Sequence, residues 1–541
     1  MFYSILFPSQ TQEQRAKRCP WLVLRPRALA PGATVTRGNK SYPADRNSLT
    51  PGRQTPSFFA DTGLEPVLDA VLGDTEETPL RRVYYALATD ADTVRYRQAV
   101  MRELEREDVG QAVRAFCGAV ESAVRTITDG ETAHLAAQRE KYLVDGAAAY
   151  CDAVHSLLAA CERWPITSDG LRLFLEAVRA YAREPRFLRL EALLRQAKEG
   201  IEAISFTLRV SQGKVWVGAD RQDGDFVHET WADFACMADD GAAAKPPREI
   251  RLFGELALGP LGILIAGVLE KEHAEAFALL HTAAEAAGAV ADPMILTFTE
   301  ETRFYLRYLD TLRALKARGL PYAYPVLSGA DTLRITGAYD LDLALRQDTV
   351  VPNDCTLLAA ERGIVITGAN HSGKTTFLRA LGQVAALAAL GLPVPCAAAK
   401  LPLFGSFFSH FSDAEEGAAE LGRLKEELCK LKPILQTAGA GSLVLLNEMF
   451  SSTTVRDAQA LAALVIGDLT GGGARVLCVT HTLSEMPDGM VSMAAQVTPD
   501  THERLYTIVR APAETRAHAD ALMAQYRLRY QDVKERISHG C

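Results

Sequence analysis

Gly363-Ile-Val-Ile-Thr-Gly368-Ala-Asn-His-Ser-Gly373-Lys374-Thr375-Thr376 is the stretch of this sequence that predicts a fold most directly. It contains an apolar strand, a loop of the form G-x-x-x-x-G-K-T and the start of a helix, in the order of a phosphate-binding P-loop. Glycines let backbone N–H groups turn toward phosphates, and the helix N-terminus adds partial positive charge. We expect Lys374 to neutralise the β and γ oxygens of ATP and Thr375 to bind Mg²⁺. The expected ATP contacts are Gly368, Ala369, Asn370, His371, Ser372, Gly373, Lys374, Thr375 and Thr376.

A second apolar strand, residues 443–446, ends in Asn447-Glu448. A nucleotide-hydrolysing site needs an acidic partner for Mg²⁺ at this place, and then a carboxylate that polarises the attacking water. Asn447 can reach Mg²⁺ through a bound water but brings no charge, so we expect weakened metal binding and turnover. Glu448 is the predicted catalytic base and a further Mg²⁺ contact. The alternative is a strand-end glutamate that pairs with a surface lysine.

A third strand, residues 475–480, delivers His481 to a strand end, where it could contact the γ-phosphate. A solvated loop histidine is the alternative. Glu448, His481 and Lys374 are therefore the predicted catalytic residues. The run 451–454, of two serines and two threonines, either forms a loop that crosses a dimer interface or caps a helix beginning near Val455.

Composition and charge exclude several classes of protein. The 541 residues are 48% hydrophobic and 23% charged, which excludes a disordered tail, a collagen-like fibre and a disulfide-stapled scaffold. The ten cysteines contain no C-x-x-C pair, so neither a zinc ribbon nor a redox dithiol is indicated, and we expect a reducing cytoplasm. No stretch reads as a membrane span: the apolar runs 252–269 and 377–392 are interpreted as buried core.

The net charge of −9 is unevenly distributed. Residues 1–57 carry nine basic and two acidic side chains, a net charge of +7. This segment is rich in Pro, Arg, Gly and Ser, and we expect a basic, flexible leader. It either contacts DNA or is an ordinary solvated leader. The candidate DNA contacts are Arg15, Lys17, Arg18, Arg25 and Arg27.

The hydrophobic pattern divides the remaining chain into a helical part and an α/β part. Helical periodicity dominates 58–330, including a helix opened by the cap candidate Ser168 and a long helix over 299–318. Alternation at 204–210 predicts a β-hairpin inserted at 204–230, near Trp216 and Trp231, which are interpreted as packing residues or as the tip of a clamp.

From residue 331 the pattern changes, because short apolar strands alternate with helices up to 510. This alternation is the sign of a mostly parallel sheet. At the start of the helical part, Phe58-Phe59 is interpreted as hydrophobic capping of the first core helix rather than as a base-stacking wedge.

These motifs resemble the MutS family of DNA mismatch-repair ATPases. The resemblance covers about 58–537 and is closest over 360–485. The segments that carry it are the P-loop with its Asn370, Gly391-Leu-Pro-Val-Pro-Cys396, the signature-like stretch at 404–428, Thr480-His481, the upstream segments 58–64 and 94–98, and 516–537. The stretch 404–428 lacks the family's Ser-x-Phe wording, and Asn447 replaces the family's Asp.

The resemblance implies a multidomain fold: an α-helical core and lever domain with a small β-hairpin insertion, then an α/β P-loop ATPase domain of the ABC/MutS type. It implies domains at 1–57 (leader), 58–330 (levers), 331–510 (ATPase) and 511–541 (a helix-turn-helix that dimerises). Residues 1–57 are too few for the family's mismatch-recognition and connector domains, and we expect no nuclease after Cys541.

The function implied is an ATP-switched clamp that acts in DNA mismatch repair or a related repair or recombination process. Two chains would sandwich two ATP molecules with Mg²⁺ in a homodimer with composite sites, and DNA would be the partner. The alternative is a slow or non-hydrolysing ATP-binding scaffold with a client other than a mismatch. A kinase, a transporter ATPase and a chromosome-organising ATPase are disfavoured, because no acceptor lid, LSGGQ-type run or long heptad arm is visible.

Overall fold

The computed structural model describes residues 34–37, 40–43, 57–72, 87–211, 214–219, 260–288, 290–329, 332–412, 420–451, 453–480, 486–498, 503–511 and 534. Several predictions lie outside these residues: the five leader contacts, Trp231, the segment 413–419, His481 and nearly all of 512–541. Two short strands of the leader are described, β1 (Thr34–Arg37) and β2 (Lys40–Pro43), which pair antiparallel. No helix in the described part of the chain is both long and apolar enough to cross a membrane.

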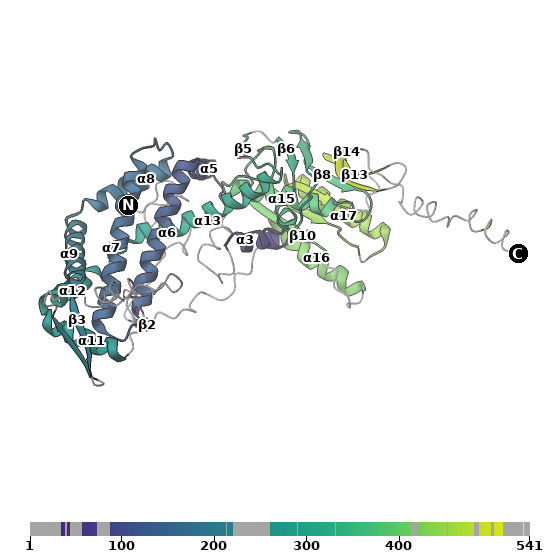
Figure 1. Ribbon diagram of the computed structural model, residues 1–541. Helices are drawn as coiled ribbons and strands as arrows, with labels where there is room; N and C mark the ends of the chain where they lie inside the picture. Colours follow the sequence, from purple (N-terminus) through teal and green to yellow (C-terminus); the bar gives the residue numbers. More distant parts are fainter. Residues whose placement is uncertain are drawn as a thin grey trace, which may run out of the picture.

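A helical arm lies at one end of the molecule and an α/β body at the other (Figure 1). The arm consists of α5 (Ala91–Glu105), α6 (Glu107–Gly130), α7 (Ala136–Cys161), α8 (Asp169–Ala182), α9 (Pro185–Glu202), α11 (Pro260–Glu272), α12 (Ala274–Ala287) and α13 (Pro293–Ala317). Its apolar residues recur at helical spacing, as Val109, Val113, Phe116 and Val120 do in α6, and all four are buried. The predicted helical pattern is therefore observed.

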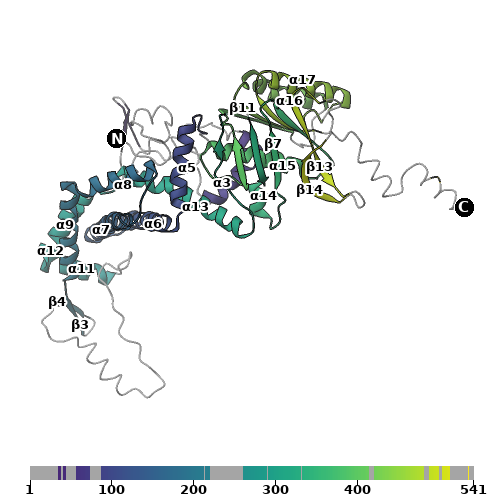
Figure 2. The ribbon, with the colours of Figure 1, turned by 90° about the horizontal axis from the view of Figure 1, so that it is seen from above.

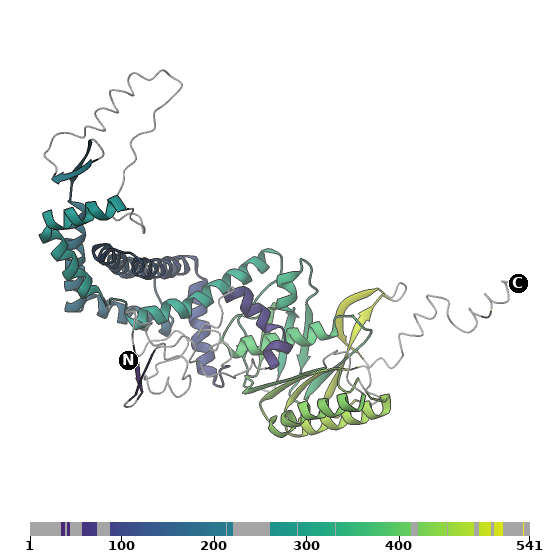
Figure 3. The same ribbon diagram turned by 90° about the horizontal axis from the view of Figure 1, so that it is seen from below.

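The long helix α13 runs from the arm toward the body, as Figure 3 shows from below. It begins at Pro293, earlier than the predicted start at 299, because Asp292 is its N-cap and accepts a hydrogen bond from the Met294 N–H at 2.7 Å. The role predicted for Ser168 is wrong in part. Ser168 occupies the N-cap position of α8, but its hydroxyl donates to the Glu103 carboxyl of α5 instead of capping the helix.

The predicted hairpin is formed by β3 (Phe206–Ser211) and β4 (Lys214–Ala219), which pair antiparallel from Phe206 opposite Ala219 to Ser211 opposite Lys214. It projects from the end of the arm that is remote from the body (Figure 2). The interpretation of Trp216 as a packing residue is wrong, because 60% of this residue is exposed.

The body contains a six-stranded sheet in the order β10-β11-β12-β8-β13-β14. All neighbours are parallel except β14, which runs antiparallel to β13. The strands are β8 (Gly363–Thr367), β10 (Ser406–Phe411), β11 (Ser442–Asn447), β12 (Arg475–Val479), β13 (Met490–Val497) and β14 (Arg504–Arg510). The mostly parallel sheet predicted from the alternating pattern is thus observed.

Helices cover both faces of this sheet. Alternate residues of a strand point to opposite faces, so each face presents apolar side chains that a helix can cover. Leu443 and Leu445 of β11 join the core that includes α15 (Lys374–Ala389), whereas Val444 and Leu446 join the core of α16 (Glu420–Thr437) and α17 (Val455–Gly471). Figure 3 shows α16 and α17 side by side on their face. Helix α15 is almost wholly buried, as expected for a core helix rather than a membrane span.

A smaller sheet packs beside the first, in the order β5-β9-β6-β7. Its strands are β5 (Val326–Leu327), β6 (Leu333–Ala338), β7 (Asn353–Leu357) and β9 (Ala398–Leu401), and α14 (Leu341–Arg346) follows β6. The helices α2 (Ser57–Asp61) and α3 (Leu64–Leu72) lie against the body. Phe58 and Phe59 are buried, and the Phe58 ring meets Phe407 of β10 edge-on at 5.1 Å. Phe58 is therefore a core residue, in contact with a strand rather than only with its own helix.

Candidate nucleotide site

The predicted P-loop joins β8 to α15 at the carboxyl edge of the large sheet, where parallel α/β sheets bind ligands. Gly368 has φ 128° and Gly373 has φ 90°, conformations that favour glycine. A Cβ atom on Gly368 would lie 2.9 Å from the Cβ of Ala495, so this position also needs glycine for space. The loop closes on itself through buried Ser372, whose hydroxyl donates to the Ala369 carbonyl at 2.7 Å.

Lys374 is the cation of this loop. Only 4% of the residue is exposed, and its ammonium donates to the carbonyl oxygens of Gly368 at 3.1 Å and Ala369 at 2.7 Å. Desolvation lowers the pKa of Lys374 below its usual 10.5, and Glu448 opposes this change. A buried ammonium whose hydrogen-bond acceptors are neutral carbonyl groups is stabilised when an anion approaches it.

The predicted magnesium ligands Thr375 and Asn447 come together, one from the start of α15 and the other from the end of β11. The Thr375 hydroxyl, in the first turn of α15, donates to the Asn447 Oδ1 atom at the end of β11, with an oxygen–oxygen distance of 3.0 Å. This contact brings the P-loop and the Asn447-Glu448 pair, which are 72 positions apart, to one place.

Glu448 begins a tight turn after β11. Its backbone N–H donates to the Val479 carbonyl of β12 at 2.9 Å. Both Glu448 (φ 53°) and Phe450 (φ 60°) are left-handed, which is uncommon for residues other than glycine. Backbone strain of this kind is tolerated where the surrounding structure holds it, and it concentrates at functional sites.

The other predicted residues lie around this centre. Asn370 and His371 are exposed at the outer side of the loop, and Thr376 is half-buried in α15. Thr480, which precedes His481, is buried, and its N–H donates to the Ile366 carbonyl of β8 at 3.2 Å. Of the run 451–454, Thr454 caps α17 by accepting from the Asp457 N–H, so the capping interpretation holds for this threonine.

The residues present fit a nucleoside triphosphate and Mg²⁺. The first N–H groups of α15 have no side-chain cap, so they are suited to phosphate oxygens, and Lys374 supplies a cation beside them. The Thr375 hydroxyl and the Asn447 amide oxygen are the hard oxygen donors that Mg²⁺ prefers, and Glu448 follows directly. When bound, Mg²⁺ supplies neutralising charge at the β and γ phosphates.

Sequence reasoning missed two residues at the edge of the site. Tyr506 of β14 has φ 56° and is 47% exposed, and a Cβ atom on Gly373 would lie 3.4 Å from its Cδ1 atom. Asn353 of β7 holds that strand: its amide donates to the Tyr506 carbonyl at 3.0 Å and accepts from the Ile508 N–H at 2.6 Å. No local pattern predicts these contacts, because they join residues more than 130 positions apart.

Comparison with known proteins agrees with this geometry. Residues 364–510 match MutS domain V. The chain is 35% identical to "Endonuclease MutS2" of Gemmatimonas aurantiaca over 32% of its own length and 21% of that protein. It is 32% identical to "DNA mismatch repair protein MutS 2" of Halobacterium salinarum over 39% of its own length and 26% of that protein. It is also 32% identical to "DNA mismatch repair protein MutS" of Thermotoga maritima, over 32% of its own length and 22% of that protein. The chain thus spans about a fifth to a quarter of these relatives.

Proposed function

We propose that this chain, whose residues 364–510 match MutS domain V, is an ATPase whose nucleotide state controls binding to DNA in mismatch repair or a related repair or recombination process. The observation that carries the proposal is the contact between Thr375 and Asn447, made beside the buried Lys374. It brings the residues of the proposed phosphate cradle, the proposed metal ligands and the start of the Glu448 turn to one sheet edge.

In the proposed reaction, the loop 368–376 binds the phosphates of ATP and Lys374 neutralises the β and γ oxygens. Thr375 and Asn447 would hold Mg²⁺, Asn447 through a water molecule. Glu448 is the general base that polarises the attacking water, and His481 contacts the γ-phosphate. Because Asn447 brings no charge, we expect hydrolysis to be slow.

The path from the nucleotide to the arm begins at the far end of α15. The Arg97 guanidinium of α5 is buried and donates to the carbonyl of Leu390, which caps α15, at 3.2 Å. Three residues further, the Pro393 carbonyl accepts from the Tyr308 hydroxyl of α13 at 2.8 Å. One helix therefore carries the P-loop at its start and contacts two arm helices at its end, which supports control of the arm by the nucleotide.

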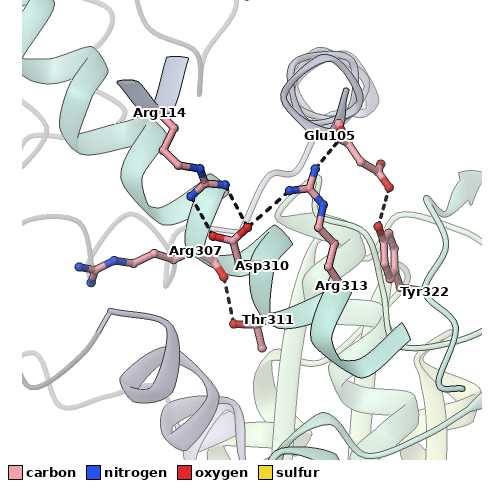
Figure 4. Close-up of polar contacts among 7 residues, drawn as sticks. All are labelled: Glu105, Arg114, Arg307, Asp310, Thr311, Arg313 and Tyr322. Carbon is pink, nitrogen blue, oxygen red and sulfur yellow. Dashed lines mark hydrogen bonds and ion pairs between the residues drawn. The ribbon is translucent and has the colours of Figure 1, made fainter. Parts of the chain in front are cut away.

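Figure 4 shows the next joint, where α13 is tied to α5 and α6. Arg114 of α6 donates to both oxygens of the Asp310 carboxylate in α13, at 2.8 and 3.0 Å. Arg313 of α13 donates to Asp310 at 3.4 Å and to the Glu105 backbone carbonyl at 2.7 Å. The Glu105 carboxylate accepts a hydrogen bond from the Tyr322 hydroxyl at 2.5 Å. Tyr322 lies between α13 and β5, on the segment that leads from the arm to the body. These contacts support a domain arrangement in which the body and the helical arm move together.

We further propose a homodimer in which each P-loop faces the signature segment of its partner, 404–428, and in which 511–541 reinforces dimerisation. The domain limits 1–57, 58–330, 331–510 and 511–541 belong to the same proposal. A reducing, cytoplasmic compartment is favoured by the thiols: the cysteines in the described residues are free, and most are buried.

The first experiment measures DNA binding by the full chain. Fluorescence anisotropy with duplex, branched and mismatched DNA, with and without ATP, should show affinity that falls as salt rises. Arg25→Gln with Arg27→Gln should reduce the slope of log affinity against log salt by about one to two, since each phosphate contact contributes about 0.9. The matched control, Lys432→Gln with Arg456→Gln, removes two exposed cations of the body and should leave the slope unchanged.

If no DNA is retained at any salt concentration, the repair function is refuted and an ATPase of unknown client remains. If the leader variant and its control behave alike, DNA binding stands but the leader is not its site. A difference in affinity among the three substrates would identify the DNA structure.

The second candidate function is an ATP-binding scaffold with little or no hydrolysis, and Asn447 is the observation that favours it. Single-turnover hydrolysis by the wild type and by Asn447→Asp separates the two. A large gain in rate with aspartate favours the scaffold, whereas similar rates favour the working ATPase.

A further inference from the structure

A buried acid and a buried histidine join α16 to the Glu448 turn. Glu427 of α16 and His410 of β10 are 8% and 4% exposed. The Glu427 Oε1 atom lies 3.2 Å from the His410 Nε2 atom and accepts a hydrogen bond from the backbone N–H of Phe450 at 2.7 Å. One carboxyl oxygen therefore links a helix, an edge strand and the turn that follows Asn447.

The turn needs such support. Glu448 and Phe450 are both left-handed, and a side chain with a Cβ atom adopts this conformation only when its surroundings impose it. The Glu448 N–H is held by Val479, and the Phe450 side chain is fully buried. The Phe450 N–H has its partner in Glu427, which comes from another element and lies 23 positions earlier in the chain.

A carboxyl group in this position is costly unless it is well bonded, because burial removes its water. An ordinary core side chain could fill the same space without that cost. The His410 ring lies against Glu427 on the side of the sheet edge, and it donates when Nε2 carries the proton. The pair thus fixes the position of α16 relative to the end of β11.

We propose that Glu427, held by His410, is a positioning residue for Glu448: it locks the turn that aims this base, so that the placement of α16 controls hydrolysis within the same chain. The inference rests on the proposed ATPase function. It adds a residue that touches neither nucleotide nor metal, and it gives α16 a role inside its own site.

The test compares Glu427→Ala, Glu427→Gln and Lys432→Ala in the full chain. Alanine removes the acceptor of the Phe450 N–H, whereas glutamine keeps an amide oxygen in its place. Lys432 is an exposed residue of the same helix, outside the signature segment 404–428, and is the matched control. His410→Ala should behave like a milder form of Glu427→Ala, because Glu427 keeps its bond to the turn.

Single-turnover hydrolysis should fall about tenfold to a hundredfold in Glu427→Ala, the range expected when a catalytic group is misplaced by about 1 Å. The affinity for ATP should stay within about twofold, because Lys374 and Thr375 do not contact Glu427. Glutamine should restore most of the rate, and Lys432→Ala should match the wild type. A purely structural role would not separate rate from affinity in this way.

Hydrogen–deuterium exchange gives a readout that does not need hydrolysis. The peptide that contains Phe450 should exchange at least about tenfold faster in Glu427→Ala than in the wild type, and at the wild-type rate in Glu427→Gln. If Glu427→Ala hydrolyses ATP as fast as the wild type, or if its exchange is unchanged, this inference is refuted and the ATPase function stands. If the wild type hydrolyses no ATP, the proposed function fails, and the inference about a base fails with it.

Discussion

Replacing Asn447 by aspartate should strengthen Mg²⁺ binding and so lower the Mg²⁺ concentration at which ATP hydrolysis is half-maximal. Asn447 Oδ1 already accepts the Thr375 hydroxyl at 3.0 Å, so a carboxylate oxygen can occupy the same position without a change of shape. The substitution therefore adds a negative charge beside the metal ligand and changes little else.

The magnitude follows from Coulomb's law. Two unit charges about 4 Å apart interact by about 4 kcal/mol at an effective dielectric of about 20, and a doubly charged ion doubles this gross attraction. Desolvation of the half-buried carboxylate, and repulsion from Glu448 next to it, oppose most of the gain. We expect a net effect of about 1–2 kcal/mol, which is about a fivefold to thirtyfold lower Mg²⁺ concentration at half-maximal rate.

The assay is single-turnover hydrolysis over a series of Mg²⁺ concentrations, for the wild type, Asn447→Asp and Asn447→Ala. Alanine removes the acceptor of the Thr375 hydroxyl, so its half-maximal concentration should move in the opposite direction. In EDTA the three proteins should be equally inactive, and their melting temperatures should show that each is folded. An aspartate variant that needs as much Mg²⁺ as the wild type would refute the placement of the metal between Thr375 and position 447.

Three further predictions concern stability and the joint. Gly391→Ala should lower the free energy of unfolding by several kcal/mol in urea titration, because φ is 75° and the new Cβ would lie 2.6 Å from the Cβ of Arg97. Burial raises the pKa of the Asp340 carboxyl in the folded protein above its usual 3.8. The free energy of unfolding should therefore fall as the pH rises from 3.8 through the pKa of the folded state. Asp340→Asn should remove this dependence, which thermal melts over a series of pH values would measure. A double-mutant cycle of Arg114→Ala and Asp310→Ala should give a coupling below about 1 kcal/mol, since both side chains are nearly half exposed, and a larger value would mean that the pair is not screened by water.

The nucleotide centre was predictable because its signals are local. The apolar strand, the glycine loop and the helix of 363–376 are contiguous, and each conformation is favoured by its own residues. The ends of β11 and β12 were predictable for the same reason. That Thr375 meets Asn447 then follows from topology, since parallel neighbouring strands end at one edge of the sheet.

Contacts that depend on distant partners were not predictable from local pattern. Ser168 has the sequence context of a helix cap, but the Glu103 carboxyl competes for its hydroxyl. Phe58 reads as the start of a helical domain, yet its ring packs edge-on against Phe407, a residue far along the chain. His410 and Glu427 each read as ordinary residues of a strand and a helix, and only the fold brings them together.

The length of α15 has a mechanical consequence. Its 16 residues span about 24 Å at about 1.5 Å per residue, with the P-loop at one end and the Arg97 contact near the other. A tilt of about 5° at the phosphates would shift the far end by about 2 Å, and the 25 residues of α13 would enlarge that displacement again toward the hairpin. Distance probes placed on the arm should therefore detect a change in the bound nucleotide. Beside the P-loop, the displacement is too small for such probes to resolve.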